Sequence, residues 1–337
     1  MRQLTVNTDR AVQWQEVPPP RLSGPLAAIV RPIAVATCDF DHLIVGGHVP
    51  LPLPIAIGHE FVAEVVEIGS DVTTVCVGDH VVVPFQISCG DCPACRQGHT
   101  SCCESQPYLS CYGLGQLGGD HGGAMSDLVG VPFADAMLVG LPPGVSPADA
   151  AACSCNVTDA YRCVGPQLLE RPGAPVLIVN GAFGNIGLYA ALIAHAMGAG
   201  TVDFVDSDPG RAAIATRLGA KLVHPDAARS ASYPITVDAS MDTDLLVIAL
   251  RATAPAGECS VSTMYPGGLT AVPLFEMFQN CVTLRTGQPH IRAHLEPVLR
   301  MVASGVLNLS AITSAVVDWE SAPAAFASGR GKTVCVR

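Results

Sequence analysis

The stretch VNGAFGNIG, residues 179–187, decides how the second half of this chain folds. It ends a short continuous apolar run, APVLIVNG (174–181), and leads into NIGLYAALIAHAMGAG (185–200), whose apolar residues have helical spacing. The next segments repeat this order, with a strand-like run TVDFVD (201–206) and a helical pattern in DPGRAAIATRLGA (208–220). Strand–helix alternation of this kind predicts a doubly wound parallel sheet with helices on its faces.

The glycines of this stretch are arranged much as in a phosphate-binding turn, but Ala182 stands at the first glycine position of the usual dinucleotide fingerprint. They follow the pattern G-x-x-G-x-x-G between a predicted strand and a predicted helix, which is the context that such a turn requires. Glycine lets the backbone approach a pyrophosphate, and the helix N-terminus offers free N–H groups to the anion. The predicted cofactor-binding residues of the turn are Gly181, Gly184, Asn185, Ile186 and Gly187.

The second predicted strand supports a dinucleotide rather than a simple phosphate. It ends at Asp206, 19 residues after Gly187, where an acidic side chain can bind ribose hydroxyls. A carboxylate there also repels the additional phosphate of NADP, so we expect NAD as the cofactor, with Arg211 covering the adenosine side. The alternative is that Asp206 only caps the following helix.

A cluster of cysteines in CGDCPACRQGHTSCC (89–103) predicts a structural zinc site. The spacing C-x2-C-x2-C-x7-C matches a closed tetrahedral site with no ligand position left for substrate. An iron–sulfur cluster or a redox C-x-x-C pair are the alternatives. The predicted ligands are Cys89, Cys92, Cys95 and Cys103, and Cys102 competes for the fourth position.

Composition limits the class of protein. The chain has 337 residues, enough for two domains, and 49% hydrophobic against 14% charged residues indicate compact folding. A formal charge of −11 disfavours nucleic acid and anionic membrane as partners. No apolar run reaches the ~18 residues of a membrane span, and the N-terminus has no signal-peptide pattern, so we expect a cytoplasmic protein.

The first 150 residues have a different texture from the second half. They are rich in glycine and proline, and their short β-type runs, such as FVAEVVEIG (61–69) and GDHVVVPF (78–85), are bounded by turn residues. This pattern predicts a β-rich domain. Further strands are expected later in the chain at residues 235–240, 257–263 and 282–287.

Three more potential metal ligands are spread along the chain. They are Cys38 in ATCDFDH (36–42), His59 beside Glu60 in IGHEF, and Cys155 in ACSCNVTDAY. No local spacing links them, and a lone buried His or Cys more often fills a core than binds metal. If they converge, two thiolates and one imidazole leave a fourth position open, which is the pattern of a catalytic zinc.

The order of these segments resembles that of the zinc-dependent medium-chain alcohol dehydrogenases over essentially the whole chain. The resemblance implies a GroES-like catalytic domain at residues 1–150, with the structural zinc lobe, and a Rossmann domain at 151–289. A C-terminal segment, 290–337, would return to the catalytic domain. The matching motifs, in family order, are Cys38-x-x-Asp41, Gly58-His59-Glu60, the four-cysteine lobe, Cys155 and the glycine turn.

The resemblance also implies roles for individual residues. Cys38, His59 and Cys155 match the ligands of the catalytic zinc. Cys155 is preferred to the neighbouring Cys153 because CNVTDAY fits the family pattern C-x-V-x-x-A-Y. Glu60 matches the acid beside the metal.

Two further positions match the surroundings of that metal. Asp41 corresponds to the carboxylate that orients the histidine ligand, and Phe85 corresponds to a wall of the substrate pocket.

Phe40 departs from the family, which usually has a hydroxyl there to pass a proton towards solvent. A pocket water, Thr158 or His42 would then take over the relay, and this interpretation is the one that we favour. For His42 by itself, however, a place in a surface loop is a better expectation than a relay role. Alternatively, the chain is a conjugate C=C reductase with NAD(P)H, or Phe40 fills the pocket and restricts it to slim substrates. A non-catalytic protein that binds NAD and zinc is disfavoured because the ligand set is intact.

The sequence therefore predicts an NAD-dependent zinc alcohol dehydrogenase with two zinc ions in each chain, one structural and one catalytic. It would interconvert an alcohol and its aldehyde or ketone by zinc-assisted hydride transfer, on an apolar or weakly polar small molecule. The resemblance implies a homodimer or homotetramer, joined through the last Rossmann strand within CVTLRTG (281–287).

Overall fold

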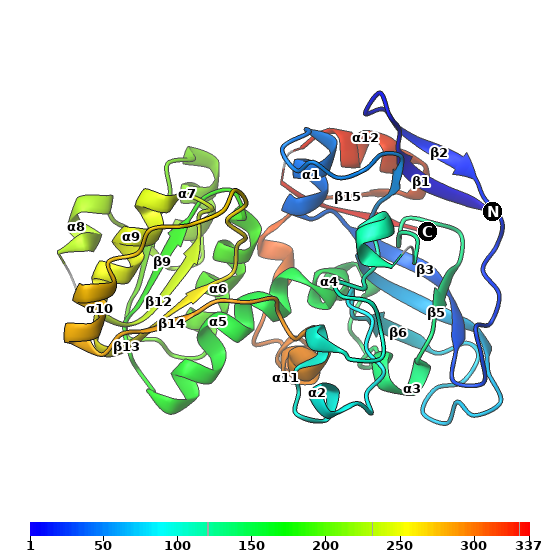
Figure 1. The fold of residues 1–337 in the computed structure, drawn as a ribbon, viewed down its shortest axis with the longest axis horizontal. Coiled ribbons are helices and arrows are strands. Elements are labelled where there is room, and N and C mark those ends of the chain that lie inside the picture. Colours follow the sequence, from blue (N-terminus) through cyan, green and yellow to red (C-terminus); the bar gives the residue numbers. More distant parts are fainter. Residues whose placement is uncertain (120, 231, 330) are drawn as a thin grey trace. The chain divides into compact units, whose positions relative to one another are not determined.

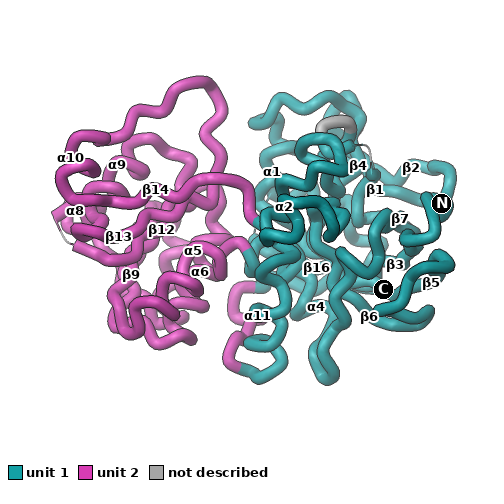
Figure 2. The backbone as a smooth tube through the Cα atoms, turned by 60° about the horizontal axis from the view of Figure 1, so that its bottom comes forward, with its two compact units in different colours: residues 1–158, 290–305, 313–337 teal, residues 159–289, 306–312 magenta. Residues whose placement is uncertain are grey.

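The computed structural model describes residues 1–119, 121–230, 232–329 and 331–337, and its contacts divide the chain into two compact units (Figure 2). Unit 1 comprises Met1–Thr158, His290–Gly305 and Thr313–Arg337, and unit 2 comprises Asp159–Pro289 and Val306–Ile312. Residues 151–158, expected at the start of the Rossmann domain, group with unit 1, and residues 306–312, expected in the C-terminal segment, group with unit 2.

Unit 2 is built on a six-stranded parallel sheet in the order β11-β10-β9-β12-β13-β14 (Figure 1). This order reverses on either side of β9, as in a Rossmann fold, and confirms the predicted doubly wound sheet. Every residue of β9 is buried, as expected of a parallel strand covered on both faces. The strands are β9 (Val176–Asn180), β10 (Val202–Val205), β11 (Lys221–Leu222), β12 (Tyr233–Ala239), β13 (Thr253–Val261) and β14 (Thr283–Arg285).

The helices of unit 2 cover this sheet. α6 packs against β9, β10 and β12, whereas α9 packs against β9, β12 and β13. Since the crossovers run in opposite directions from β9, right-handed connections place α6 and α9 on opposite faces. The elements are α5 (Asn156–Glu170), which begins in unit 1, α6 (Gly184–Ala196), α7 (Pro209–Arg217), α8 (Pro225–Arg229), α9 (Thr243–Ala252), α10 (Leu274–Asn280) and the 3-10 turn η4 (Leu309–Ala311).

The helix predicted to run to residue 200 ends earlier, at Ala196. Met197 is its C-cap, and Gly198 follows with a φ of +78°. Glycine adopts this left-handed conformation without the steric cost that a side chain brings, so it stops the helix.

Unit 1 contains a larger sheet in the order β15-β16-β3-β5-β6-β8, with β7 paired to β3, and a smaller sheet in the order β2-β1-β4. The two strand-like runs expected in this region form β5 and β6. The strands are β1 (Arg2–Val6), β2 (Val12–Glu16), β3 (Ala28–Ala36), β4 (Ile55–Ala56), β5 (Glu60–Ile68), β6 (His80–Val83), β7 (Val129–Val131), β8 (Val139–Gly140), β15 (Thr313–Asp318) and β16 (Lys332–Val336).

One pairing in unit 1 matters most for the site. β16, at the end of the chain, runs antiparallel to β3 with Val334 opposite Ala36, so it places Lys332 beside the end of β3. The buried apolar residues of β3, β5 and β6 form the core beneath, with Phe61 and Tyr112 in edge-to-face contact at 5.5 Å.

Short helices connect the strands of unit 1. They are α1 (Asp39–Val45), α2 (Pro93–Arg96), α3 (Ala134–Met137), α4 (Pro147–Ala150), α11 (Ile291–Ala303) and α12 (Ala322–Ala327), with 3-10 turns η1 (Thr100–Cys102), η2 (Gly115–Gly118), η3 (Ala151–Ser154) and η5 (Trp319–Ser321). Within the described ranges, none of the helices combines the length and the hydropathy that a bilayer crossing demands.

Candidate metal centre and nucleotide-binding turn

Four potential metal ligands converge in unit 1 although they are far apart in the sequence. Cys38 directly precedes α1, His59 and Glu60 lie at the start of β5, and Cys155 follows η3. One ligand atom of each lies within 4.8 Å of the others, and all four residues are buried. The structure therefore brings together the residues that sequence spacing alone did not connect.

This arrangement fits a zinc ion. Zinc lies about 2.3 Å from a thiolate sulfur and about 2.0–2.1 Å from an imidazole nitrogen, so two ligand atoms around one ion are at most roughly 4.6 Å apart. The separations within the cluster are of this size. Two sulfurs and one nitrogen also form the donor set of a site that keeps one position open.

Asp41 fixes two of these ligands. Its Oδ2 accepts a hydrogen bond of 2.9 Å from the backbone N–H of Cys38, and its Oδ1 lies 3.4 Å from Nδ1 of His59. The second contact is within ion-pair reach, but it is long, and Nδ1 makes no well-formed hydrogen bond with the described residues. Since Nδ1 faces Asp41, Nε2 is the nitrogen left for a metal. The ring of Phe85 lies 5.5 Å from that of His59, centroid to centroid.

Neighbouring groups shift the pKa values of the residues in this cluster. A hydrogen bond with Cys155 holds the pKa of Cys38 well below its usual value, and the charge of His59 acts in the same direction. Burial lowers the pKa of His59, but the negative charges of Asp41 and Cys38 outweigh it, so the pKa is raised. Burial raises the pKa of Glu60 to about 8. A thiolate beside an imidazolium is the pair that a metal ion replaces by displacing the proton.

Two buried residues that the sequence analysis did not single out complete this cluster. Nζ of Lys332 donates to Oε2 of Glu60 at 2.5 Å, to Oδ1 of Asn156 at 2.7 Å and to the carbonyl of Thr37 at 2.7 Å. The backbone N–H of Asn156, the first residue of α5, donates to Oε1 of Glu60 at 3.1 Å. A lysine at the start of the strand-like run KTVCV was the signal that the sequence offered.

The four-cysteine lobe forms a second group with the same property. The ligand atoms of all four predicted cysteines lie within 4.8 Å of one another, whereas the neighbouring Cys102 is exposed and outside the group. The members are Cys89, Cys92, Cys95 and Cys103. This geometry suits a closed four-thiolate zinc site.

Backbone N–H groups in this lobe donate hydrogen bonds to cysteine sulfurs. The N–H of Cys92 points at Sγ of Cys89 (3.3 Å), that of Cys89 at Cys103 (3.4 Å) and that of Glu104 at Cys92 (3.4 Å). Burial raises the pKa of Cys89, but hydrogen bonds from Ser105 and from backbone amides outweigh it and lower it to about 6. Donors aimed at sulfur favour the ionised form that binds metal.

The glycine turn of unit 2 has little space for side chains. A Cβ at Gly181 would lie 2.6 Å from the carbonyl of Ser240, and one at Gly184 would lie 2.4 Å from Cδ of Arg211. Gly187 leaves room for Asn180, whose Oδ1 would be 2.1 Å from such a Cβ. The glycines therefore allow close packing of β9, α6 and the end of β12, with the guanidinium arm of Arg211 over the start of α6.

Asp206 is bound within unit 2. Arg211 donates to both of its carboxylate oxygens, at 2.7 and 2.8 Å, and Nδ2 of Asn180 donates at 2.7 Å. Its side chain is 0% exposed, against 32% for Arg211. Asp208, not Asp206, is the N-cap of α7, so the capping alternative considered for Asp206 is wrong.

The sequence of this chain is similar to those of known dehydrogenases. Residues 24–143 match the alcohol dehydrogenase GroES-like domain. Over 99% of this chain and 86% of that protein, the sequence is 29% identical to a probable zinc-binding alcohol dehydrogenase of Mycobacterium tuberculosis. It is 35% identical to the medium chain reductase/dehydrogenase ucsI of Acremonium sp, over 60% of this chain and 69% of that protein. The chain belongs to the zinc-dependent medium-chain dehydrogenase/reductase family.

A solved structure of this family has the same fold. Alcohol dehydrogenase TADH from Thermus sp. ATN1 aligns over 100% of this chain and 99% of its own, with a TM-score of 0.90 and 29% identity. The predicted family and the predicted fold class, a GroES-like β-rich domain with a Rossmann domain, are thereby confirmed.

The position where this family usually carries a relay hydroxyl is filled by a half-buried ring. Phe40 packs against the core of unit 1. Of the two relay candidates within the chain, Thr158 donates its hydroxyl to the carbonyl of Cys153 at 2.6 Å. Both ring nitrogens of His42 are buried and have no hydrogen-bond partner among the described residues.

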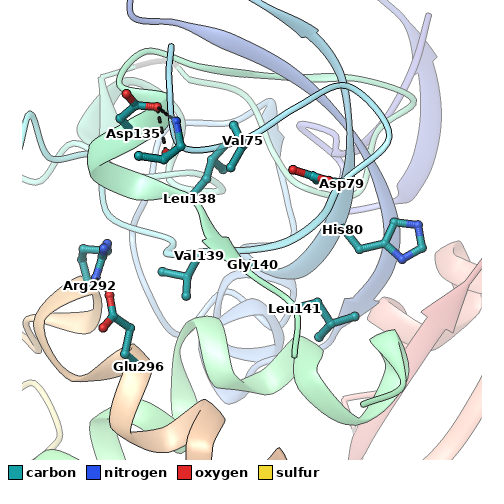
Figure 3. A pocket seen from close by; sticks show the side chains of 11 residues that line it. Val75, Asp79, His80, Asp135, Leu138, Val139, Gly140, Leu141, Arg292 and Glu296 are labelled. Carbon is teal, nitrogen blue, oxygen red and sulfur yellow. Dashed lines mark hydrogen bonds and ion pairs between the residues drawn. The ribbon is translucent and has the colours of Figure 1, made fainter. Parts of the chain in front are cut away.

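Elsewhere in unit 1, several charged side chains line a pocket of about 480 Å³ (Figure 3). Asp135 accepts hydrogen bonds from the amides and hydroxyls of Thr73 and Thr74. Arg292 donates to the carbonyl of Ala136 at 2.8 Å and to Glu296 at 3.0 Å. These hydrogen bonds join α3 to the loop at Thr73 and Thr74 and to α11.

Proposed function

We propose that this member of the family is a zinc alcohol dehydrogenase that interconverts an alcohol and its aldehyde or ketone with NAD as the hydride acceptor. The observation that carries the proposal is the convergence of Cys38, His59 and Cys155 with Glu60 in one buried cluster. The names of similar proteins, which include zinc-binding and zinc-type alcohol dehydrogenases, support the same reaction class.

Cys38, His59 and Cys155 would hold the catalytic zinc. When bound, zinc supplies a Lewis acid that polarises an alcohol or carbonyl oxygen. Asp41 orients the imidazole through Nδ1, and Lys332 holds Glu60 at the edge of the cluster. Burial of these groups excludes water, which strengthens their electrostatic interactions.

The four-cysteine lobe would hold the second, structural zinc. Cys89, Cys92, Cys95 and Cys103 belong to a loop with only short helical turns, so a metal there would order the loop. Phe40 and Phe85 are the residues that we assign to the walls of the substrate pocket, which favours apolar or weakly polar substrates.

Unit 2 would bind the cofactor through its glycine turn. Gly181, Gly184, Asn185, Ile186 and Gly187 surround the N-terminus of α6, where N–H groups without intrahelical acceptors favour a pyrophosphate. At the end of β10, the Asp206–Arg211 pair would face the adenosine ribose. The preference for NAD rests on the carboxylate of Asp206. Arg211 must release one oxygen of this carboxylate before that oxygen can bind the ribose hydroxyls.

His42 is the residue that we assign to the proton relay. Its buried ring nitrogens make no hydrogen bond with described residues, whereas the hydroxyl of Thr158 is committed to Cys153. An imidazole can donate a hydrogen bond from one ring nitrogen and accept one at the other, which is the pattern that a relay needs.

Product analysis with cinnamaldehyde and NADH tests the reaction. We expect the allylic alcohol, formed by reduction of the carbonyl. The saturated aldehyde would instead show conjugate reduction and would overturn the proposed reaction. Cys155→Ala should abolish product formation and release one zinc ion. Cys153→Ala, a change two residues away, should keep product formation and the zinc content of the wild type. The reverse result would refute the ligand assignment.

We also propose a homodimer or homotetramer that pairs through β14. This strand is at the edge of the sheet of unit 2, and α10, which precedes it, exposes three large apolar side chains. They are Leu274, Phe275 and Phe278, which are 69%, 71% and 76% exposed. Sedimentation should show a dimer or tetramer for the wild type and a smaller species for Phe278→Asp.

A further inference from the structure

Asn156 contacts three of the four residues of the catalytic cluster. Its Nδ2 donates to Sγ of Cys38 at 3.3 Å and to Sγ of Cys155 at 3.6 Å, and its backbone N–H donates to Glu60. The residue is 0% exposed. A single side-chain amide thus lies across both sulfurs of the candidate zinc site.

The orientation of this amide is fixed from both ends. Oδ1 of Asn156 accepts from Nζ of Lys332 at 2.7 Å, and Nδ2 faces the sulfurs. Reversing the amide would turn its oxygen towards two thiolates and its NH2 group towards an ammonium, and both contacts would be repulsive. The network therefore directs the NH2 group of the amide at the two sulfurs.

We propose that Asn156 is a positioning residue that draws charge from the two zinc thiolates and so makes the metal they hold a stronger Lewis acid. The proposal rests on the proposed function. A hydrogen bond to a metal-bound thiolate reduces the electron density that the sulfur gives to the metal. Lys332 strengthens the effect because a cation at Oδ1 polarises the amide and makes its N–H bonds better donors.

The side chain of Asn156 can be altered without losing the rest of its contacts. Asn156→Ala keeps the backbone N–H that binds Glu60 and removes only the side-chain contacts with sulfur and Lys332. Asn156→Asp keeps the shape and the acceptor for Lys332 but turns a carboxylate oxygen, which repels thiolates, towards the sulfurs in place of the N–H donor. The second variant serves if the first leaves a cavity that the fold does not tolerate.

Cadmium-113 NMR on the cadmium-loaded full chain is the test, because the two sites provide an internal reference. We expect one resonance from the four-thiolate site and one from the two-thiolate site. Both Asn156 variants should move the second resonance towards the first, since their sulfurs donate more strongly, and should leave the first in place. Ser154→Ala, which removes buried hydrogen bonds to Phe61 and Ala151 without touching a ligand, should move neither.

Activity of the zinc-loaded protein gives an independent readout. We expect kcat to fall at least about tenfold in both variants, as is typical when a group behind a metal ligand is lost, and the pH at which kcat rises to move upward. A two-thiolate resonance that stays in place in both variants would overturn the role of Asn156 and leave the proposed function standing. Absence of that resonance in the wild type would overturn the metal site itself.

Discussion

Lys332→Met is expected to destabilise unit 1, because it removes one partner of a completely buried ion pair. The chain contains two lysines, of which Lys332 is completely buried and Lys221 is exposed. Methionine keeps most of the apolar length of the lysine side chain but loses all three hydrogen bonds of Nζ. Glu60, also 0% exposed, would keep the hydrogen bond from the backbone N–H of Asn156.

The magnitude follows from the burial of this ion pair. Removing one partner of a buried pair costs about 3–5 kcal/mol, because the other charge is left without compensation. Glu60 already has a pKa of about 8, so it can take up a proton near neutral pH instead of remaining charged. We therefore expect the loss at pH 7 to be at the lower end, about 3 kcal/mol.

Urea unfolding of the metal-free protein, followed by tryptophan fluorescence, measures this loss. Both tryptophans of the chain, Trp14 and Trp319, lie in unit 1, so the signal reports on the unit that contains Lys332. Lys221→Met is the matched control, and its unfolding free energy should stay within about 0.5 kcal/mol of wild type because the side chain is exposed.

A double-mutant cycle with Glu60→Gln separates the ion pair from other effects. The double variant should recover much of the loss, since no buried charge then lacks a partner, and the coupling energy should be about 2 kcal/mol or more. A coupling below about 0.5 kcal/mol, with Lys332→Met as stable as its control, would refute the view that the pair holds the cluster together.

Three further predictions concern the metal and cofactor sites. Cys103→Ser should lower the zinc content from two ions to one, while Cys102→Ser should leave it unchanged, as elemental analysis of purified protein would show. In competition with a chelator, Cys155→Ser should bind metal at the catalytic site more than about 100-fold more weakly than wild type, because loss of a ligand costs more than the loss of a group behind one. Equal affinity would contradict the place of Cys155 among the ligands. Asp206→Ala should remove the carboxylate that repels the additional phosphate of NADP and shift binding from NADH towards NADPH by about tenfold or more in fluorescence titrations. An unchanged ratio of the two affinities would show that the carboxylate does not set the choice of cofactor.

The sequence was sufficient where the physical cause is local. Alternating apolar runs and helical patterns after residue 174 predicted β9, α6, β10 and α7, because periodicity reports which side of an element is buried. The four-cysteine lobe could also be predicted from the sequence. Its four cysteines lie within one loop, and their spacing alone keeps their sulfurs close together. Asp206 was found because it ends a strand at a fixed distance from the turn.

The tertiary structure decided what depends on contacts between distant segments. Lys332 and Glu60 are separated by 272 positions in sequence and meet because β16 pairs with β3 beside β5. The choice of Cys155 over Cys153 likewise rested on resemblance until η3 placed one sulfur in the cluster and left the other outside it. Such groups leave no periodic trace in the sequence, because their burial is compensated by partners that only the folded chain supplies.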